Sequence, residues 1–265
     1  MGFLTDLVTE LRLDLAARPL DGGSLRAEAR AQAAARDVAA ALTKAAVTDG
    51  VALIAEVKRA SPSAGSIAAD ADPVAQARAY ASAGAAVVSV LTEPVHFGGS
   101  LGDLRAVRAA VERPVLRKDF LIEADQVLAA RAAGADSVLL IAASLDDDAL
   151  AALLTAARDL GMEPLVESHT DEDLDRVLAT DARIVGVNAR DLESLDVDVA
   201  AALGRMRRIP ADRIGVFESG IRTRADVGRA VDAGASAILV GETLMRAGDP
   251  AAAARALLGK EVRTP

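Results

Sequence analysis

The sequence predicts an α/β protein, a (β/α)8 TIM barrel with an N-terminal helical extension. Eight apolar, strand-like runs occur along its 265 residues, and an Ala/Leu-rich helical stretch follows each run. An internal repeat places Gly84, Gly134 and Gly234 at separations of 50 and 100 residues. These separations equal two and four βα units of about 25 residues, as expected for a barrel of about 250 residues. An open doubly wound sheet is the alternative, but no GxGxxG fingerprint follows the first strand.

The extension comes first and reads as helical over residues 3–48. Apolar residues recur at three-to-four spacing in its first part, and Asp21-Gly22-Gly23-Ser24 then interrupts the pattern. A second, Ala/Arg-rich helix is expected to follow, up to a turn at Asp49-Gly50. We expect residues 1–265 to form a single barrel domain, with residues 1–48 as an extension packed on it.

The eight expected strands lie at residues 52–58, 86–93, 114–120, 137–144, 163–168, 183–190, 213–219 and 237–242. Three of them follow a repeated helix end and Gly-Ala turn, in SAGAAVVSV, AAGADSVLL and DAGASAILV. Glycine is suited to ending a helix in the left-handed conformation before a short loop.

Composition excludes several classes of function. The chain has no cysteine, so disulfides, thiolate metal sites and cysteine nucleophiles are absent. A net charge of −9 and a pI near 4.9 argue against nucleic acid or an anionic membrane as partner. His96 and His169 are the only histidines, and no further ligands stand at metal-binding spacing. No apolar run is long enough to span a membrane and no signal peptide is recognisable, so we expect a cytoplasmic protein.

Charged and amide side chains stand at the carboxyl ends of the expected strands. Because side chains alternate along a strand, Glu56 and Lys58 share one face, and that face points into the barrel mouth where active sites lie. Interstrand salt bridges could explain any one such residue, but an unpartnered buried charge costs several kcal/mol. Repetition on five strands therefore favours an active site. The candidates are three carboxylates (Glu56, Glu167 and Glu218), three cations (Lys58, Lys118 and Arg190) and Asn188.

Glycine- and serine-containing loops follow the first, seventh and eighth strands. Loops after strands seven and eight of a barrel commonly bind phosphate, because glycine lets the backbone approach the ligand. The predicted phosphate-binding residues are Ser61, Ser219, Gly220, Gly241 and Glu242. Phe97 and Phe120 could line a pocket for an aromatic ligand, whereas Phe217 should point outward toward the helices.

Eight segments closely resemble the indole-3-glycerol-phosphate synthases of tryptophan biosynthesis. The resemblance extends from the helical extension to the end of strand eight. The segments are AEVKRASPSAG, SVLTEPVHFGGS, LRKDFLI, GADSVLLI, VES, VGVNARDL, ESGI and VGETLM.

The resemblance implies a carboxy-lyase that uses neither metal nor organic cofactor. Such an enzyme converts 1-(2-carboxyphenylamino)-1-deoxyribulose 5-phosphate to indole-3-glycerol phosphate, CO2 and water. It implies that Lys118 is the general acid of ring closure, that Glu167 acts in the dehydration, and that Lys58 holds the anthranilate carboxylate. Glu56 and Asn188 would complete the catalytic set. Ser61, Phe97, Phe120, Arg190 and Glu218 would bind the substrate.

The expected partner is therefore a phosphorylated small molecule, with no nucleic acid and no membrane. We expect a monomer, with a weak dimer as the alternative. Two other functions stay open. One is a sister phosphate-binding barrel, such as phosphoribosylanthranilate isomerase or a class I aldolase with Lys118 as Schiff-base nucleophile. The other is a non-catalytic barrel that binds phosphosugars.

Overall fold

The computed structural model describes residues 2–260 and contains a closed barrel of parallel strands, as predicted. The strand order around the barrel is β1-β10-β9-β8-β7-β6-β5-β4, and β1 pairs with both β10 and β4. The open-sheet alternative is therefore wrong. The barrel strands are β1 (Ala52–Val57), β4 (Val87–Leu91), β5 (Val115–Lys118), β6 (Ser137–Ile141), β7 (Leu165–Ser168), β8 (Ile184–Asn188), β9 (Ile214–Glu218) and β10 (Ala237–Val240).

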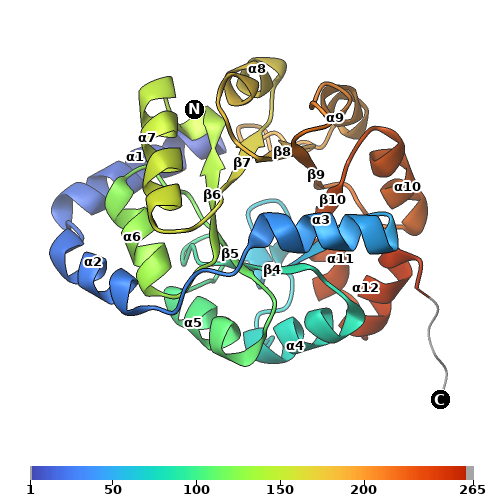
Figure 1. Ribbon diagram of the computed structural model, residues 1–265, viewed down its shortest axis with the longest axis horizontal. Coiled ribbons are helices and arrows are strands. Elements are labelled where there is room, and N and C mark those ends of the chain that lie inside the picture. The colour runs from blue at the N-terminus through green and yellow to red at the C-terminus, as the bar shows by residue number, and fades with distance from the viewer. Residues whose placement is uncertain (1, 261–265) are drawn as a thin grey trace.

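Helices follow the strands and surround the barrel (Figure 1). They are α4 (Pro73–Ala83), α5 (Leu101–Ala110), α6 (Ala124–Ala132), α7 (Asp147–Asp159), α8 (Asp171–Ala179), α9 (Val199–Met206), α10 (Arg224–Asp232), α11 (Glu242–Met245) and α12 (Pro250–Leu258). Two strands of a short hairpin, β2 (Ala60–Ser61) and β3 (Gly65–Ser66), lie in the loop after β1. The repeat glycines Gly84, Gly134 and Gly234 have φ values of 98°, 91° and 102°, which confirms their predicted place at left-handed helix ends.

The expected strand over residues 137–144 is too long. Residues Ala142–Ser144 form a 3₁₀ turn, η1, after β6. The Ser144 hydroxyl donates to the Ile141 carbonyl at 2.8 Å, and the Leu145 N–H donates to the Ala142 carbonyl at 3.2 Å. These local bonds end the strand although the apolar run continues.

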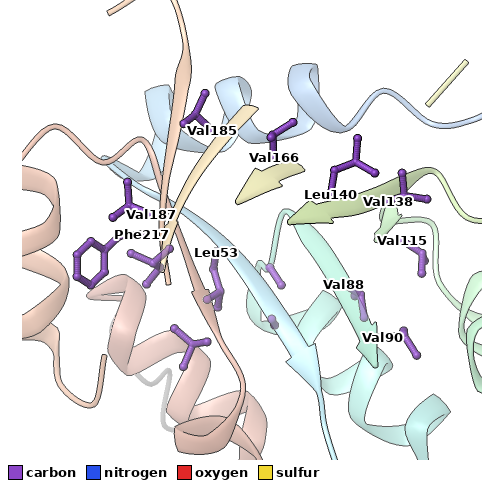
Figure 2. Packing of buried hydrophobic residues seen from close by; sticks show 14 of the residues in the cluster. Leu53, Val88, Val90, Val115, Val138, Leu140, Val166, Val185, Val187 and Phe217 are labelled. Carbon is purple, nitrogen blue, oxygen red and sulfur yellow. The ribbon is translucent and has the colours of Figure 1, made fainter. Parts of the chain in front are cut away.

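Alternating side chains divide the apolar residues into two layers. Outward-facing residues such as Leu53, Val187 and Phe217 pack against the helices (Figure 2). Inward-facing residues such as Ile54 and Leu165 fill the barrel interior. Phe217 is fully buried in the outer layer, which confirms that it points away from the barrel interior.

The extension contains three helices rather than the two expected, namely α1 (Phe3–Ala17), α2 (Gly22–Ala31) and α3 (Val38–Asp49). The expected second helix is broken between α2 and α3. There the Gln32 amide donates to the Ala132 carbonyl at 2.8 Å, and the Arg36 N–H donates to Asp136 Oδ1 at 2.8 Å. These tertiary bonds outweigh the helix propensity of an Ala-rich segment.

The extension contacts both ends of the barrel. Val38, Ala39 and Leu42 of α3 are buried against residues that begin strands, among them Ala52 and Ala237, so α3 closes the amino end (Figure 1). At the other end, Phe3 N and Leu4 N donate to the carbonyls of Glu193 and Leu192 in the loop after β8. The single-domain prediction also covers residues 1 and 261–265, which lie outside the described residues. No helix within residues 2–260 has the length and apolar character needed to cross a membrane.

Candidate active site

A cavity of about 490 Å³ opens at the carboxyl ends of the barrel strands. Every site residue predicted from the sequence lines it. These residues are Glu56, Lys58, Ser61, Phe97, Lys118, Phe120, Glu167, Asn188, Arg190, Glu218, Ser219, Gly220, Gly241 and Glu242. The barrel thus brings residues from β1, β5, β7, β8, β9 and β10 to one place, while their individual roles stay predictions.

Lys118 forms the centre of the polar cluster. Its Nζ lies 2.9 Å from Glu167 Oε2 and 3.5 Å from Glu218 Oε2. All three side chains are almost completely buried. Gly186 makes room for this arrangement, because a Cβ added there would lie 2.5 Å from Glu218 Oε1. In the sequence, the glycine of VGVN could have indicated this. It is a small residue on the sixth strand, which lies between the strands that carry the two carboxylates.

Burial and mutual charge set the protonation states of the cluster. Burial alone would lower the pKa of Lys118, but the carboxylates of Glu167, Glu218 and Glu56 outweigh it and raise that pKa above its usual value. Burial alone would raise the pKa of Glu167, but Lys118 and His169 hold it well below the usual range. Burial raises the pKa of Glu218 well above normal, and the neighbouring Glu167 charge raises it further. Burial and charge therefore favour the protonated form of Lys118, the ionised form of Glu167 and the protonated form of Glu218.

Lys58 pairs with Glu56, its neighbour on the same face of β1, at 3.0 Å. Arg190 lines the cavity, as predicted, and also contacts the loop after β8. Its guanidinium donates to the Leu195 carbonyl at 2.6 Å, and its backbone forms an isolated antiparallel bridge with Val197. Arg190 therefore stabilises the loop that forms part of the cavity wall.

The loops predicted to bind phosphate meet at one side of the cavity. Ser219 and Gly220 have φ values of 66° and 74°, so this turn exposes its backbone in a conformation unusual for a serine. A Cβ added at Gly241 would lie 2.4 Å from Glu56 Oε1, so a side chain there would displace the Glu56 carboxylate. The Glu242 carboxylate turns to the surface and pairs with Arg246 at 2.9 Å. Only the backbone of Glu242 is therefore suited to an anion.

The aromatic side of the cavity contains one residue that the sequence did not single out for the site. Phe97 and Phe120 lie with ring centroids 6.1 Å apart, and Phe3 lies edge-on to Phe120 at 6.5 Å. Phe3 is the first residue of α1. It reaches the mouth because α1 folds back over the barrel, which no local sequence pattern records.

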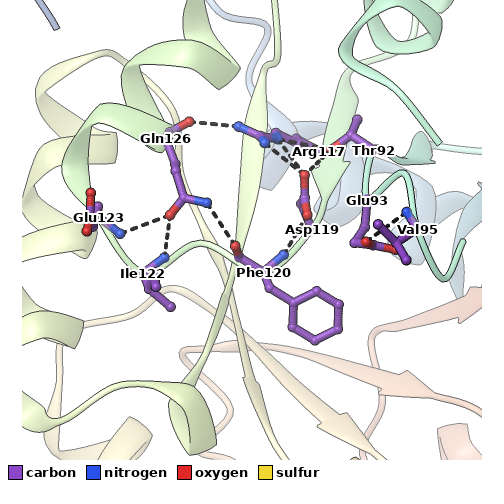
Figure 3. Close-up of polar contacts among 9 residues, drawn as sticks. All are labelled: Thr92, Glu93, Val95, Arg117, Asp119, Phe120, Ile122, Glu123 and Gln126. Atoms are coloured by element: carbon purple, nitrogen blue, oxygen red, sulfur yellow. Dashed lines mark hydrogen bonds and ion pairs between the residues drawn. The ribbon is translucent and has the colours of Figure 1, made fainter. Parts of the chain in front are cut away.

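A hydrogen-bonded turn after β5 holds Phe120 in place, two residues beyond Lys118 (Figure 3). Asp119 Oδ2 accepts from Arg117 at 2.8 Å and from the Thr92 hydroxyl, while its Oδ1 accepts from the Phe120 N–H at 2.9 Å. Gln126 accepts from the N–H groups of Ile122 and Glu123 and donates to the Phe120 carbonyl. Side chains from α6 and from the end of β5 thus form hydrogen bonds with the backbone groups of the turn that follows the candidate catalytic lysine.

His169 also contacts the polar cluster around Lys118. Its Nε2 lies 2.9 Å from Glu167 Oε1, and its side chain is 3% exposed. The same alternation that pairs Glu56 with Lys58 places residue 169 on the face of residue 167. Within residues 2–260, no group of three or more His, Cys, Asp or Glu residues is arranged to hold a metal ion.

A closed barrel with this polar cavity at the carboxyl ends of its strands places the chain among the (β/α)8-barrel enzymes. The family model for indole-3-glycerol phosphate synthase matches residues 4–257. The chain therefore belongs to the indole-3-glycerol phosphate synthase family. The members of this family are carboxy-lyases of tryptophan biosynthesis.

Relatives that bear this name match almost the whole chain. One from a Nocardioides species is 49% identical over 263 residues, covering 98% of this chain and 100% of the relative. One from Mycobacterium avium is 48% identical over 252 residues, covering 94% of this chain and 91% of the relative.

Two solved structures are similar in fold alone, since their sequence identity is low. A 3-hexulose-6-phosphate synthase has a TM-score of 0.61 at 22% identity, covering 79% of this chain and 99% of that one. The tryptophan synthase alpha subunit of Legionella pneumophila has a TM-score of 0.57 at 16% identity, covering 83% and 95%.

Proposed function

We propose that this protein closes the indole ring of indole-3-glycerol phosphate by general acid–base catalysis from buried lysine and glutamate side chains. The substrate is 1-(2-carboxyphenylamino)-1-deoxyribulose 5-phosphate. The observation that carries the proposal is the buried contact of Lys118 with Glu167 and Glu218 in a cavity that opens at the barrel mouth.

Lys118 acts first, as general acid. An aryl carbon attacks the ribulose carbonyl, and the carbonyl oxygen becomes a hydroxyl by taking a proton. The raised pKa of Lys118 keeps the ammonium protonated for this transfer. Loss of the carboxylate as CO2 then restores the aromatic ring.

Glu167 acts in the dehydration that follows. This step removes a proton from the ring-closed intermediate and expels the new hydroxyl as water. The lowered pKa of Glu167 keeps it ionised and able to accept the proton. The proton taken up by Glu167 leaves with the hydroxyl as water, and solvent replaces the proton that Lys118 gave up in the first step.

The remaining residues bind and orient the substrate. Lys58 holds the anthranilate carboxylate, and Glu56 orients Lys58 at 3.0 Å. Asn188 Nδ2 donates to Glu167 Oε1 at 3.3 Å, and Asn188 Oδ1 accepts from the Arg190 N–H at 2.9 Å, which fixes the direction of the amide. Phe97 and Phe120 enclose the aryl ring, and the turns at Ser61, Ser219-Gly220 and Gly241-Glu242 surround the phosphate.

The direct test is to incubate the protein with the carboxyphenylamino-deoxyribulose phosphate and follow indole fluorescence. We expect turnover by the wild type and a loss of about 10²–10⁴-fold in kcat for Lys118→Ala, because general acid catalysis contributes that much. Lys44→Ala is the matched control, since Lys44 is an exposed lysine on α3. It should retain wild-type turnover.

Two results would contradict the proposal. Wild-type binding of the substrate without any indole signal would favour a non-catalytic phosphosugar-binding barrel. Covalent trapping of Lys118 by borohydride in the presence of substrate would favour an aldolase-type imine, which the proposed reaction does not form.

A further inference from the structure

His169 is the buried polar group that the proposed mechanism leaves without a task. Both ring nitrogens are buried and neither makes a regular hydrogen bond with any residue from 2 to 260. An unsatisfied buried polar group costs about 1–3 kcal/mol, so its presence calls for an explanation. The polar atom next to the ring is Glu167 Oε1, 2.9 Å from Nε2.

The backbone holds the imidazole firmly at this place. The His169 N–H donates to Asp173 Oδ2 at 3.2 Å, and the Thr170 N–H donates to the same oxygen at 3.1 Å. Asp173 and Thr170 also form the capping box that begins α8. The backbone that carries the ring is therefore fixed by the start of a helix.

Glu167 is surrounded by donors from three strands. Its Oε2 faces Lys118 Nζ at 2.9 Å, while its Oε1 faces Asn188 Nδ2 at 3.3 Å and His169 Nε2 at 2.9 Å. Two groups that hold Oε1 leave Oε2 directed at the lysine. The bent contact with His169 can straighten when substrate binds, since catalytic hydrogen bonds are often poorly aligned without ligand.

We propose that His169 is a positioning residue that holds the Glu167 carboxylate in the orientation needed to accept a proton from the substrate. This inference rests on the proposed function. Its Nε2 carries the proton and points to Glu167, and its Nδ1 takes no part.

Electrostatics supports the same role, because His169 contributes to holding the pKa of Glu167 below its usual value, after the larger effect of Lys118. Loss of His169 should therefore raise the pKa of Glu167 and move the acidic limb of the pH–rate profile to higher pH. The titratable groups that face Glu167 and His169 are Lys118 from β5, Glu218 from β9, Glu56 from β1 and Asp191 after β8.

Three substitutions test whether the position of the hydrogen-bond donor matters or only the presence of a polar group. His169→Gln places an amide N–H near the position of Nε2, His169→Asn places one near Nδ1, and His169→Leu removes both. We expect His169→Asn and His169→Leu to lower kcat by about 10–100-fold with little change in KM, because a misplaced catalytic group costs about that much. We expect His169→Gln to restore most of kcat and the wild-type acidic limb.

A readout without substrate keeps this inference separate from the proposed function. In protein labelled with 13C in its glutamate carboxyls, the Glu167 signal is identified by its absence in Glu167→Gln. Its titration midpoint should rise in His169→Leu and His169→Asn but not in His169→Gln. Equal midpoints and equal kcat in all three variants and the wild type would overturn the inference. An inactive wild type whose Glu167 midpoint still moves would overturn the proposed function alone.

Discussion

At the scale of single residues, one lysine faces two carboxyl groups. Glu167 and Glu218 both contact Lys118, at 2.9 Å and 3.5 Å, and both are buried. Two carboxylates that share one buried site cannot both ionise cheaply, so their pKa values move apart. The pKa of Glu218 is raised and the pKa of Glu167 is lowered, as expected for two carboxyl groups that share one site. The group whose pKa is raised thus lies beside the base that the proposed reaction needs.

Glu218→Gln should stabilise the protein increasingly as pH rises. Glu218 has a folded-state pKa above its ordinary value of 4.5, so it favours folding while protonated and opposes folding as pH rises above that value. Glutamine mimics the protonated side chain at every pH. Urea unfolding at pH 5 and pH 8 should therefore show a larger gain for Glu218→Gln over wild type at pH 8.

Glu10→Gln serves as the control for this effect, since Glu10 is an exposed carboxylate on α1. Its effect should be the same at both pH values. A gain for Glu218→Gln that is equal at pH 5 and pH 8 would mean that Glu218 is ionised in the folded protein.

The sequence could predict which side chains share the cavity but not how they pair. Alternation along single strands was enough to place Glu56 with Lys58 and to turn Phe217 outward. The contact between Lys118 on β5 and Glu218 on β9 crosses the barrel, and no period within one strand encodes such a distance. The contact between Arg190 and the Leu195 carbonyl could not be predicted either, because the turn after β8 sets it.

At the scale of elements, a buried aspartate ties the extension to the barrel. The Asp136 carboxylate has no exposed surface and accepts from the backbone N–H groups of Arg36 and Val115 at 2.8 Å and 2.9 Å. Arg108 Nε lies 2.9 Å from the same carboxylate. Asp136 precedes β6, so it joins the segment between α2 and α3 to β5 and α5.

Asp136→Asn should lower the free energy of unfolding by about 3–5 kcal/mol, because it removes one partner of a buried ion pair and turns one of the two oxygens that accept backbone N–H groups into an NH2 donor. Asp181→Asn is the matched control. Asp181 pairs with Arg158 at 2.7 Å, but its side chain is 79% exposed, so the loss should stay below about 1 kcal/mol. Urea unfolding measures both changes, and comparable losses would show that Asp136 does not act as a buried tether.

The same contacts explain why the break in the extension was missed. Residues 32–37 read QAAARD and contain no Gly or Pro, so local propensity favours a continuous helix. The break is stabilised by groups about 100 residues away in the chain, Ala132 and Asp136. The strands were predictable because a barrel strand must be apolar, and this requirement is visible along the chain itself.

At the scale of the whole molecule, the extension joins the two ends of the barrel. Helix α3 closes the amino end with Leu42, which is fully buried, while α1 brings Phe3 to the mouth. Active sites of such barrels lie at the carboxyl end, and the amino end serves stability. The two ends of one segment should therefore affect different properties of the protein.

Leu42→Ala and Phe3→Ala test this division. Leu42→Ala should lower the free energy of unfolding by about 2–5 kcal/mol, because it leaves a cavity in the inner core, and should leave KM nearly unchanged below the melting temperature. Phe3→Ala should raise KM by up to about tenfold, since an aromatic contact contributes about 0.5–1.5 kcal/mol beyond its buried area. Its effect on unfolding should be smaller than that of Leu42→Ala, because Phe3 is only partly buried. Urea unfolding and steady-state kinetics on both variants give the comparison. If Leu42→Ala raised KM as much as Phe3→Ala does, the two ends would be coupled through the barrel, and α1 would not contribute to the mouth independently of α3.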